Sequence, residues 1–516
     1  MKFIKKFFFH RITLLLFAIL IQLLVLISVI SFFNDYFVFF YWISILISII
    51  AVLAIVNNHI NPAYKLAWII VILVFPIFGG LFYIFFGGKK LSKRAKNKLK
   101  SIDDKIKRSL PPRESILKEI RLENEIAAIQ SRYIQDYAYF PPFYNTISEY
   151  LADGEIIFEK LKEELEKAKK YIFLEYFIIH EGEMWDSILS ILEKKAAEGV
   201  DVRIIYDDVG CLFTLPYKYG IELEKRGIKS CVFNPLVPIL SPLLNNRDHR
   251  KMTIIDGHTA FTGGINLADE YINKIERFGH WKDSAIMFKG KAVWSMTVMF
   301  LSMWGYLSGD EENLDDFKTG KLKPNSIDYD KKSYDGYIQP FADSPLDDEP
   351  VGEIVYLNLI NKARKYVYIT TPYLIIDNEM VTALLAAAKG GVDVRIITPY
   401  FADKRYVHAL TRSYYGVLIK SGVKIYEYTP GFIHSKTFIT DDDYGVVGTI
   451  NLDYRSLFLH FECGVWLYNS DTICDMKDDF LKTLNLCKEI TVDEFKDIKW
   501  YNTLARSVLR LFAPLM

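Results

Sequence analysis

Cysteine is scarce in this sequence, and its arrangement excludes common cysteine-based sites. The five cysteines are Cys211, Cys231, Cys463, Cys474 and Cys487. They are widely scattered and odd in number, and no two stand in a C-x2-C pair, so the spacing of a structural zinc site is absent. We therefore expect buried or idle thiols in a reducing compartment.

The formal net charge is zero, but the basic and acidic residues are distributed unevenly along the chain. Residues 1–100 contain 12 Lys or Arg and one acidic residue, Asp35, whereas the remainder contains 51 Lys or Arg against 62 Asp or Glu. An acidic body of this kind argues against a protein whose main partner is nucleic acid. We expect no nucleic-acid partner.

Long apolar runs are plentiful near the start of the chain, at 12–33, 37–56 and 66–86. Each reaches the roughly 20 residues needed to span a bilayer. No small-residue cleavage site follows the first run before Asn34, so a cleaved signal peptide is not expected. The pattern predicts a transmembrane anchor region over 1–88, with two or three helices.

The orientation of this anchor follows from its basic flanks. Seven Lys or Arg lie between positions 89 and 100 and favour a cytoplasmic body. Lys2, Lys5, Lys6 and Arg11 also favour the cytoplasm, and three spans cannot satisfy both groups. Either the N-terminus is forced outside, or the first run lies in the membrane without crossing it. We favour a cytoplasmic location for the part of the chain that follows the anchor. Whether the first run, 12–33, crosses the membrane is left open.

The rest of the chain is a charged helical connector (89–144) followed by a duplicated α/β unit. Segments 168–179, 199–205 and 227–235 are echoed at 363–376, 391–397 and 422–430. The repeat predicts two halves, 145–325 and 326–490, each alternating strands and helices. The first half carries an extra apolar loop, 237–246, which either contacts lipid or is a plain surface loop. The tail, 491–516, is either an interfacial helix or a helix packed on the body.

The strongest pattern is a motif that occurs twice at identical spacing. Its members are His249, Lys251, Asp256, Gly263 and Asn266 in the first copy, and His434, Lys436, Asp441, Gly448 and Asn451 in the second. Strand alternation places each His and Lys on one face, where a nucleophile or proton carrier stands beside a fixed positive charge. One copy would most simply be an ordinary strand with surface charge. Two copies with the same continuation indicate phosphoryl chemistry.

The doubled motif H-x-K-x4-D-x6-G-[GST]-x-N resembles the signature of the phospholipase D superfamily. Its flanks, NNRDHRKMTIIDGHTAFTGGINLADEY, RFGHWKD and GTINLDYRSLFLHFE, are similar to those of bacterial cardiolipin synthases. The resemblance implies a duplicated phospholipase D-type α/β sandwich with N-terminal transmembrane helices. His460 departs from the pattern, because Asn is expected before Phe461-Glu462.

The two halves would place both histidines around one phosphodiester. One His attacks phosphorus to form a phosphohistidine, and the other serves as acid and base. The family resemblance favours His249 as nucleophile and His434 as acid/base, an order that the residues alone do not give. Lys251, Lys436, Asn266 and Asn451 would bind the non-bridging oxygens.

The resemblance also implies a carboxylate for each histidine, supplied from downstream in the same half. This expectation points to Asp283 for the first half and Glu462 for the second. Asp256 and Asp441 belong to the motif and are expected to have a more structural role. Asp207 and Asp208 end a strand, where paired acids are usually turn residues, and we expect no metal and no cofactor.

The predicted reaction is cardiolipin synthesis in the bacterial cell membrane. A phosphatidyl group passes from one phosphatidylglycerol to His and then to a second phosphatidylglycerol, with release of glycerol. The alternative is a phospholipase D or transphosphatidylase that uses water or another alcohol, since the motif does not set the acceptor. A nuclease of the same superfamily is more distant, because the anchors and the acidic body oppose it. A non-enzymatic scaffold would be expected to lose a motif residue, and none is lost.

Overall fold

The computed structural model divides into two compact units, each described here by itself. The described residues are 20–21, 24, 27–28, 31, 37–58, 60–75, 79–86, 93–236, 245–310, 312–318, 336–347, 349–495 and 500–515. One unit comprises 1–91, 234–246 and 511–516, and the other comprises 92–233 and 247–510. The apolar run at 12–33, most of the loop at 237–246 and the predicted boundary between the halves at 325–326 lie outside the described residues.

The smaller unit contains the helices α3 (Phe37–Asn57), α4 (Pro62–Val74) and α5 (Gly79–Phe86). The predicted run 66–86 is therefore divided between two helices, α4 ending at Val74 and α5 beginning at Gly79. A Cβ on Gly80 would lie 2.7 Å from Ser48 Cα, so glycine allows α5 to approach α3 closely. Within the described part of the chain, no helix has both the length and the apolar character required to cross a membrane.

The larger unit begins with four helical segments that pack on the body. They are α6 (Lys93–Ser109), α7 (Glu114–Glu123), α8 (Glu125–Tyr133) and the π-helix η2 (Ile134–Ala138). The Trp466 indole donates to Gln130 Oε1 at 3.1 Å, and Ser131 Oγ donates to Gln339 Oε1 at 2.7 Å. The charged connector is helical, as expected from the sequence, and much of it is buried against the second sheet.

The first sheet has seven strands in the order β1-β9-β7-β6-β2-β3-β4, and β2, β3 and β4 are parallel. Its strands are β1 (Thr146–Leu151), β2 (Tyr171–Tyr176), β3 (Asp201–Asp207), β4 (Lys229–Phe233), β6 (Met252–Ile255), β7 (Thr259–Gly263) and β9 (Ala285–Gly290). Its helices are α9 (Gly154–Glu166), α10 (Glu183–Ala197), α11 (Tyr219–Lys225) and α12 (Val293–Ser308).

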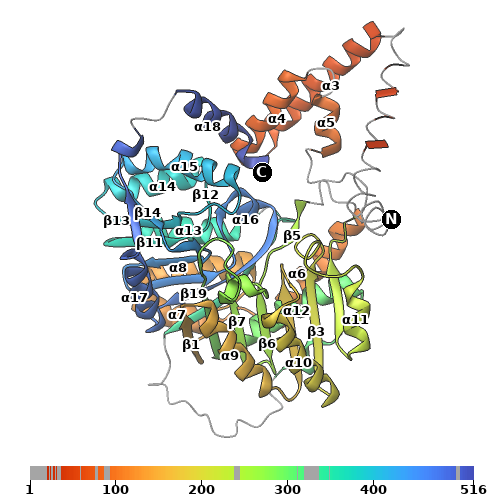
Figure 1. Cartoon of the computed structure of the whole chain (residues 1–516), viewed down its shortest axis with the longest axis vertical. Coiled ribbons are helices and arrows are strands. Elements are labelled where there is room, and N and C mark those ends of the chain that lie inside the picture. The colour runs from red at the N-terminus through yellow and green to blue at the C-terminus, as the bar shows by residue number, and fades with distance from the viewer. Residues whose placement is uncertain are drawn as a thin grey trace. The chain divides into compact units, whose positions relative to one another are not determined.

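The second sheet repeats this order as β10-β19-β17-β16-β11-β13-β14 and adds β20 at its edge. Its strands are β10 (Tyr337–Asp343), β11 (Tyr366–Thr370), β13 (Asp393–Pro399), β14 (Lys424–Tyr428), β16 (Thr437–Thr440), β17 (Tyr444–Gly448), β19 (His460–Tyr468) and β20 (Cys487–Ile490). Its helices are α13 (Val351–Lys362), α14 (Asn378–Lys389), α15 (Arg405–Ile419) and α17 (Thr472–Leu484). The prediction of a duplicated α/β unit is confirmed (Figure 1).

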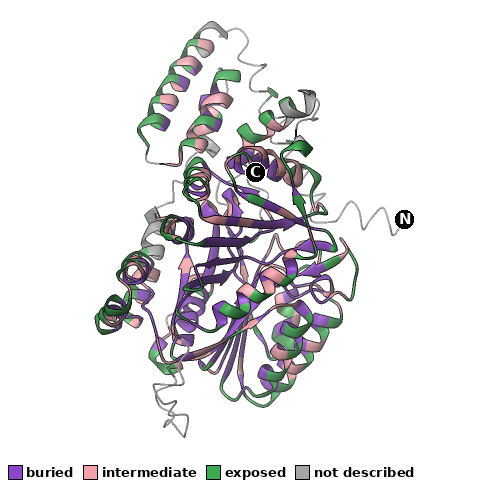
Figure 2. Cartoon of the chain, turned by 90° about the vertical axis from the view of Figure 1, so that its left-hand side faces the viewer, coloured by how far each residue is buried: buried purple, intermediate pink, exposed green. Residues whose placement is uncertain are grey.

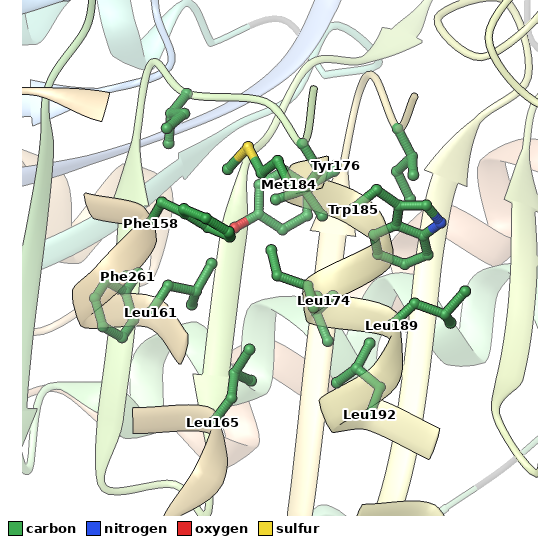
Figure 3. Close-up of a cluster of buried hydrophobic side chains, with 14 of the residues drawn as sticks. Phe158, Leu161, Leu165, Leu174, Tyr176, Met184, Trp185, Leu189, Leu192 and Phe261 are labelled. Carbon is green, nitrogen blue, oxygen red and sulfur yellow. The ribbon is translucent and has the colours of Figure 1, made fainter. Parts of the chain in front are cut away.

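Apolar faces of helices cover the sheets. In the first half, α9 contributes Phe158, Leu161 and Leu165, and α10 contributes Trp185 and Leu189, all packed toward the strands (Figure 3). Full burial of a side chain of this size contributes roughly 1.5–3 kcal/mol. In Figure 2 the strands are largely buried while the outer helix faces are exposed. β2 (YIFLEY) is buried along its whole length, as its mainly apolar sequence predicts for a strand covered on both faces.

Two short parallel ladders join the halves of this larger unit. β5 (Arg247–Asp248) pairs with the start of β19, so that Arg247 lies opposite His460 and Asp248 opposite Phe461. β8 (His280–Lys282) pairs with β15 (Gly431–Ile433), ending with Lys282 opposite Ile433. Each ladder ends one residue before a motif histidine. A third pair, β12 (Leu374–Ile375) with β18 (Leu452–Asp453), lies within the second half.

Candidate active site

The motif histidines and lysines are buried at the points where β6 and β16 begin. His249 and His434 are each 7% exposed, and Lys251 and Lys436 are each 1% exposed. Lys251 Nζ donates to the His249 carbonyl at 2.6 Å, and Lys436 Nζ donates to the His434 carbonyl. Each lysine is thereby held beside the histidine of its own copy.

Each histidine is hydrogen-bonded to a carboxylate from the opposite half. His249 Nδ1 lies 2.9 Å from Glu462 Oε1, and His434 Nδ1 lies 2.8 Å from Asp283 Oδ2. Both carboxylates are completely buried. His434 Nδ1 also lies 2.8 Å from Lys436 Nζ. Because a carboxylate only accepts, the contacts with Glu462 and Asp283 favour the hydrogen on each Nδ1 and the lone pair on each Nε2.

The expectation that each histidine uses a carboxylate of its own half is wrong. The carboxylates themselves are the predicted ones, but the pairing is exchanged. The ladders between the halves explain the exchange: His249 N donates to Phe461 O at 2.9 Å, and His434 N donates to Lys282 O at 2.7 Å. The next residue along each ladder is the carboxylate, which therefore lies opposite the histidine of the other half.

Aromatic rings surround both imidazoles. The His249 ring lies 5.1 Å from Phe177 and 5.4 Å from His460, centroid to centroid. The His434 ring lies 5.4 Å from Trp281 and 5.7 Å from Tyr271. The sequence marked His460 only as a departure from the family pattern, and it did not identify Phe177, Trp281 or Tyr271, because none of them belongs to the motif.

Burial and clustered positive charge keep both histidines neutral. Burial lowers the pKa of His249 well below its usual value, and Lys251 and Lys436 act in the same direction. Burial lowers the pKa of His434 to about 4 despite the opposing effect of Asp283. A neutral His249 is the form that can attack phosphorus. A bound phosphodiester anion would favour protonation of His434, as an acid requires.

The two lysines are also affected by burial. Desolvation lowers the pKa of Lys251 to about 8 and that of Lys436 to about 7. Lys251 lowers the pKa of Lys436 further, because two ammonium groups repel each other in one buried site. An anion placed between them relieves this repulsion, so the site is electrostatically prepared for a phosphodiester.

The motif aspartates lie at the far ends of their strands and bind backbone. Asp256 accepts hydrogen bonds from the N–H groups of Lys169, Lys170 and Tyr171, at 2.7–2.9 Å. Asp441 accepts the equivalent three from 364–366, at 2.6–2.9 Å. Both have positive φ, 53° and 58°, which Asp tolerates better than most residues. They fix the start of β2 and β11 and do not contact the histidines.

The two motif asparagines differ. Asn266 Oδ1 accepts from Ile178 N at 3.0 Å, and its Nδ2 donates to Tyr271 Oη at 2.7 Å. Asn451 Nδ2 donates to Asp453 at 3.2 Å, whereas its buried Oδ1 has no hydrogen-bond partner among the described residues. Both amide atoms of Asn266 are therefore hydrogen-bonded within the protein, whereas the side-chain oxygen of Asn451 is unpaired among the described residues.

Close packing accounts for the small residues of the motif. A Cβ on Gly263 would lie 2.3 Å from Ser284 O, and one on Gly448 would lie 2.4 Å from Cys463 O. At Gly264, in the [GST] position of the motif, a Cβ would lie 2.0 Å from the Asp283 carboxylate. Thr449, in the same position of the second copy, donates its hydroxyl to Glu462. Gly264 and Thr449 therefore help to fix the orientations of the Asp283 and Glu462 carboxylates, respectively.

One group of side chains has the spacing of a possible metal site. Ligand atoms of His249, His460 and Glu462 lie within 4.8 Å of one another, the one such group found in the described residues. The neighbouring Lys251 and Lys436 oppose a divalent cation there. Asp207, which ends β3, accepts from the N–H groups of 209 and 210 and from Arg247, as a turn residue does.

Comparisons with known proteins agree with this geometry. The family model described as "Cardiolipin synthase, PLD-like domain" matches residues 161–300 and 356–484, and the model "Phospholipase_D-nuclease N-terminal" matches 46–88. A cardiolipin synthase of Halalkalibacterium halodurans is 33% identical over 92% of this chain and 93% of its own length. The chain belongs to the cardiolipin synthase family of the phospholipase D superfamily.

Two further proteins are similar to this chain. An uncharacterized protein of Streptococcus mutans is 46% identical over 90% of this chain and 99% of its own length. The crystal structure of a phosphatidylserine synthase from Haemophilus influenzae superimposes with a TM-score of 0.55 at 16% identity, covering 75% of this chain and 97% of that chain. The structural match supports a shared fold. Members of the cardiolipin synthase family act on phospholipids at membranes.

Proposed function

We propose that the protein is a cardiolipin synthase in which His249 and His434 divide the chemistry. His249 Nε2 attacks the phosphorus of one phosphatidylglycerol, and the bond to glycerol breaks as His434 protonates the leaving oxygen. The terminal hydroxyl of a second phosphatidylglycerol then attacks the phosphohistidine and gives its proton to His434. Cardiolipin leaves, and both histidines return to their starting protonation states.

The observation that carries this proposal is the pair of crossed carboxylate–histidine hydrogen bonds. Glu462 and Asp283 fix both Nδ1–H tautomers, so each Nε2 is free for a different task. Lys251 and Lys436 supply the charge that stabilises the developing negative oxygens. The predicted phosphate-binding role has less support for both motif asparagines: both amide atoms of Asn266 are engaged, and the unpaired Oδ1 of Asn451 is an acceptor, which suits a substrate hydroxyl and not a phosphate oxygen.

The N-terminal region is proposed to anchor the enzyme in the bacterial cell membrane, with the catalytic body in the cytoplasm. Supporting features are exposed apolar side chains on α3, such as Phe39, Trp42 and Leu53, and the basic cluster at 89–100. A cysteine at Ala95, in a background without native cysteines, should resist an impermeant thiol reagent in intact cells and react after lysis. Labelling of intact cells would reverse the orientation.

Product analysis tests the reaction. The purified full-length protein, given phosphatidylglycerol alone in vesicles or detergent, should yield cardiolipin and free glycerol with little phosphatidic acid. Excess chelator should not stop it, and added glycerol should slow or reverse it, because the exchange is nearly isoenergetic. Phosphatidic acid as the dominant product would indicate a phospholipase D. Cleavage of DNA without action on lipid would refute the proposal.

A further inference from the structure

Cardiolipin synthesis brings a second phosphate to the site, and the motif lysines are committed to the first. Resting on the function proposed above, we propose that Arg455, oriented by His460, forms a subsite for the phosphodiester of the acceptor lipid. The acceptor hydroxyl is joined to its own phosphate by one glycerol unit, so an anion site beside His249 would place that hydroxyl over the phosphohistidine.

Arg455 lies on the short helix α16 (Tyr454–Phe458), next to the catalytic cluster. Its Nε donates to His460 Nε2 at 3.3 Å, and the His460 ring in turn lies 5.4 Å from the His249 ring. The guanidinium is thus one side chain removed from the nucleophile. It is half-buried, which leaves it open to a ligand.

The two Nη groups of Arg455 have no hydrogen bond or ion pair with any residue that the structure describes. Nearby carboxylates are already engaged: Asp453 accepts from Ser456 N and Asn451 Nδ2, and Glu462 binds His249. By contrast, Arg412 in the same half forms a two-point ion pair with Glu427. A free planar fork is suited to bidentate binding of a phosphate.

His460 has the properties of a positioning residue. It is 9% exposed, and its Nδ1 has no hydrogen-bond partner among the described residues. Burial lowers its pKa to about 3, so the ring stays neutral and its Nε2 can accept from Arg455. The Asn expected here from the family pattern has a shorter side chain than His.

The local field favours an anion over a metal ion at this place. Lys251, Lys436 and Arg455 all lower the pKa of His249, which shows that positive potential dominates around it. A divalent cation bound by His249, His460 and Glu462 would meet this potential and would remove the nucleophile. A second phosphodiester instead neutralises the charge of Arg455.

The test compares two acceptors that react with the same phosphohistidine. Cardiolipin formation uses an acceptor with a phosphate, whereas exchange of labelled glycerol into phosphatidylglycerol uses a neutral one. Arg455→Gln should lower cardiolipin formation about tenfold or more, mainly through a raised KM for phosphatidylglycerol, while glycerol exchange falls much less. Water should capture more of the intermediate, so the phosphatidic acid fraction should rise.

Two further variants and a control complete the design. Arg455→Lys keeps the positive charge but not the planar guanidinium, and its loss of cardiolipin formation should be intermediate between wild type and Arg455→Gln. His460→Asn should shift the product ratio in the same direction by a smaller factor. Arg226→Gln, which removes an arginine paired with Glu193 and Glu222, should behave as wild type in both assays. Thermal melts show which variants fold, and only the folded variants are compared.

Equal loss of cardiolipin formation and glycerol exchange in the folded Arg455 variants would refute the subsite, and so would no loss in either. These outcomes differ from failure of the proposed function itself. In that case the wild-type protein would produce neither cardiolipin nor exchanged phosphatidylglycerol.

Discussion

The two halves of the catalytic body share a strand order but differ in what surrounds each histidine. His434 lies 5.4 Å from Trp281, and His249 lies 5.4 Å from His460. Trp281 and His460 occupy equivalent places, each two residues before the carboxylate that binds the histidine of the other half. The same position is apolar on one side and polar on the other.

A second difference separates the motif asparagines. Asn266 uses both amide atoms within the protein, whereas Asn451 keeps one buried acceptor unpaired. Arg455, whose Nε donates to His460, lies on the His249 side of the site. Duplication thus built a symmetric catalytic pair, and His460 and Arg455 add polar groups beside His249.

The first prediction removes the catalytic pair. His249→Ala and His434→Ala should each reduce turnover by about 10³-fold or more, because each half supplies one histidine. His180→Ala, a half-buried histidine outside the site, is the control and should retain activity. Mass spectrometry of acid-quenched enzyme should find the phosphatidyl adduct on His249. An adduct on His434 would reverse the assigned roles.

The second prediction concerns Glu462 and Asp283, the carboxylates that each bind the catalytic histidine of the opposite half. Glu462→Gln and Asp283→Asn should each lower kcat by about 10²–10⁴-fold, because the histidine loses its fixed tautomer. Asp283 raises the pKa of His434 through its charge and hydrogen bond. His434 must be protonated to act as an acid, so Asp283→Asn should move the alkaline limb of the pH–rate profile to lower pH.

The same limb should stay in place for Glu462→Gln, because Glu462 binds the other histidine. Profiles of kcat between pH 4 and 9 would measure this, because kcat reports the substrate-bound enzyme, in which the phosphodiester favours protonation of His434. An alkaline limb that moves in Glu462→Gln but not in Asp283→Asn would restore pairing within each half.

The sequence predicted the duplicated fold and the motif residues because both leave periodic signals. The repeated segments correspond to β2, β3 and β4 and to β11, β13 and β14. The identities of Asp283 and Glu462 followed from the family pattern, but their partners did not. Pairing depends on the two- and three-residue ladders between halves, which are too short to leave any periodicity.

Other features were beyond the sequence for a similar reason. Arg455 becomes notable only when its neighbours are seen to have other partners. Burial of α7 and α8 depends on contacts such as that of Gln130 with Trp466, which are hundreds of residues apart. Mixed polar and apolar spacing in that segment did not reveal which surface would cover it.

The third prediction concerns the motif aspartates, where the halves agree. Asp256→Asn and Asp441→Asn each weaken a carboxylate that accepts three backbone hydrogen bonds, and stability should fall by about 1–3 kcal/mol. Asparagine tolerates the positive φ, so the fold should persist. Activity of the folded variants should change only a few-fold, measured beside thermal melts. A loss as large as that of His249→Ala would instead give these residues a direct part in the chemistry.

The smallest expected effect is the pH dependence of stability contributed by His460, which has no titratable counterpart at Trp281. Its folded pKa is lowered to about 3 from a usual value near 6.5. Above pH 6.5 neither the folded nor the unfolded form binds a proton there, and the stability is fully present. As pH falls through 6.5 toward 3, the unfolded chain takes up a proton that the folded protein does not, and stability declines by at most about 1.4 kcal/mol per pH unit. Full-length His460→Asn should therefore lose less stability than wild type between pH 7 and 5, whereas Trp281→Phe should keep the wild-type slope. Equal slopes in wild type and His460→Asn would mean that His460 titrates over the same pH range in the folded and unfolded states, so its folded pKa is not lowered and the neutral acceptor proposed for Arg455 would lose its support.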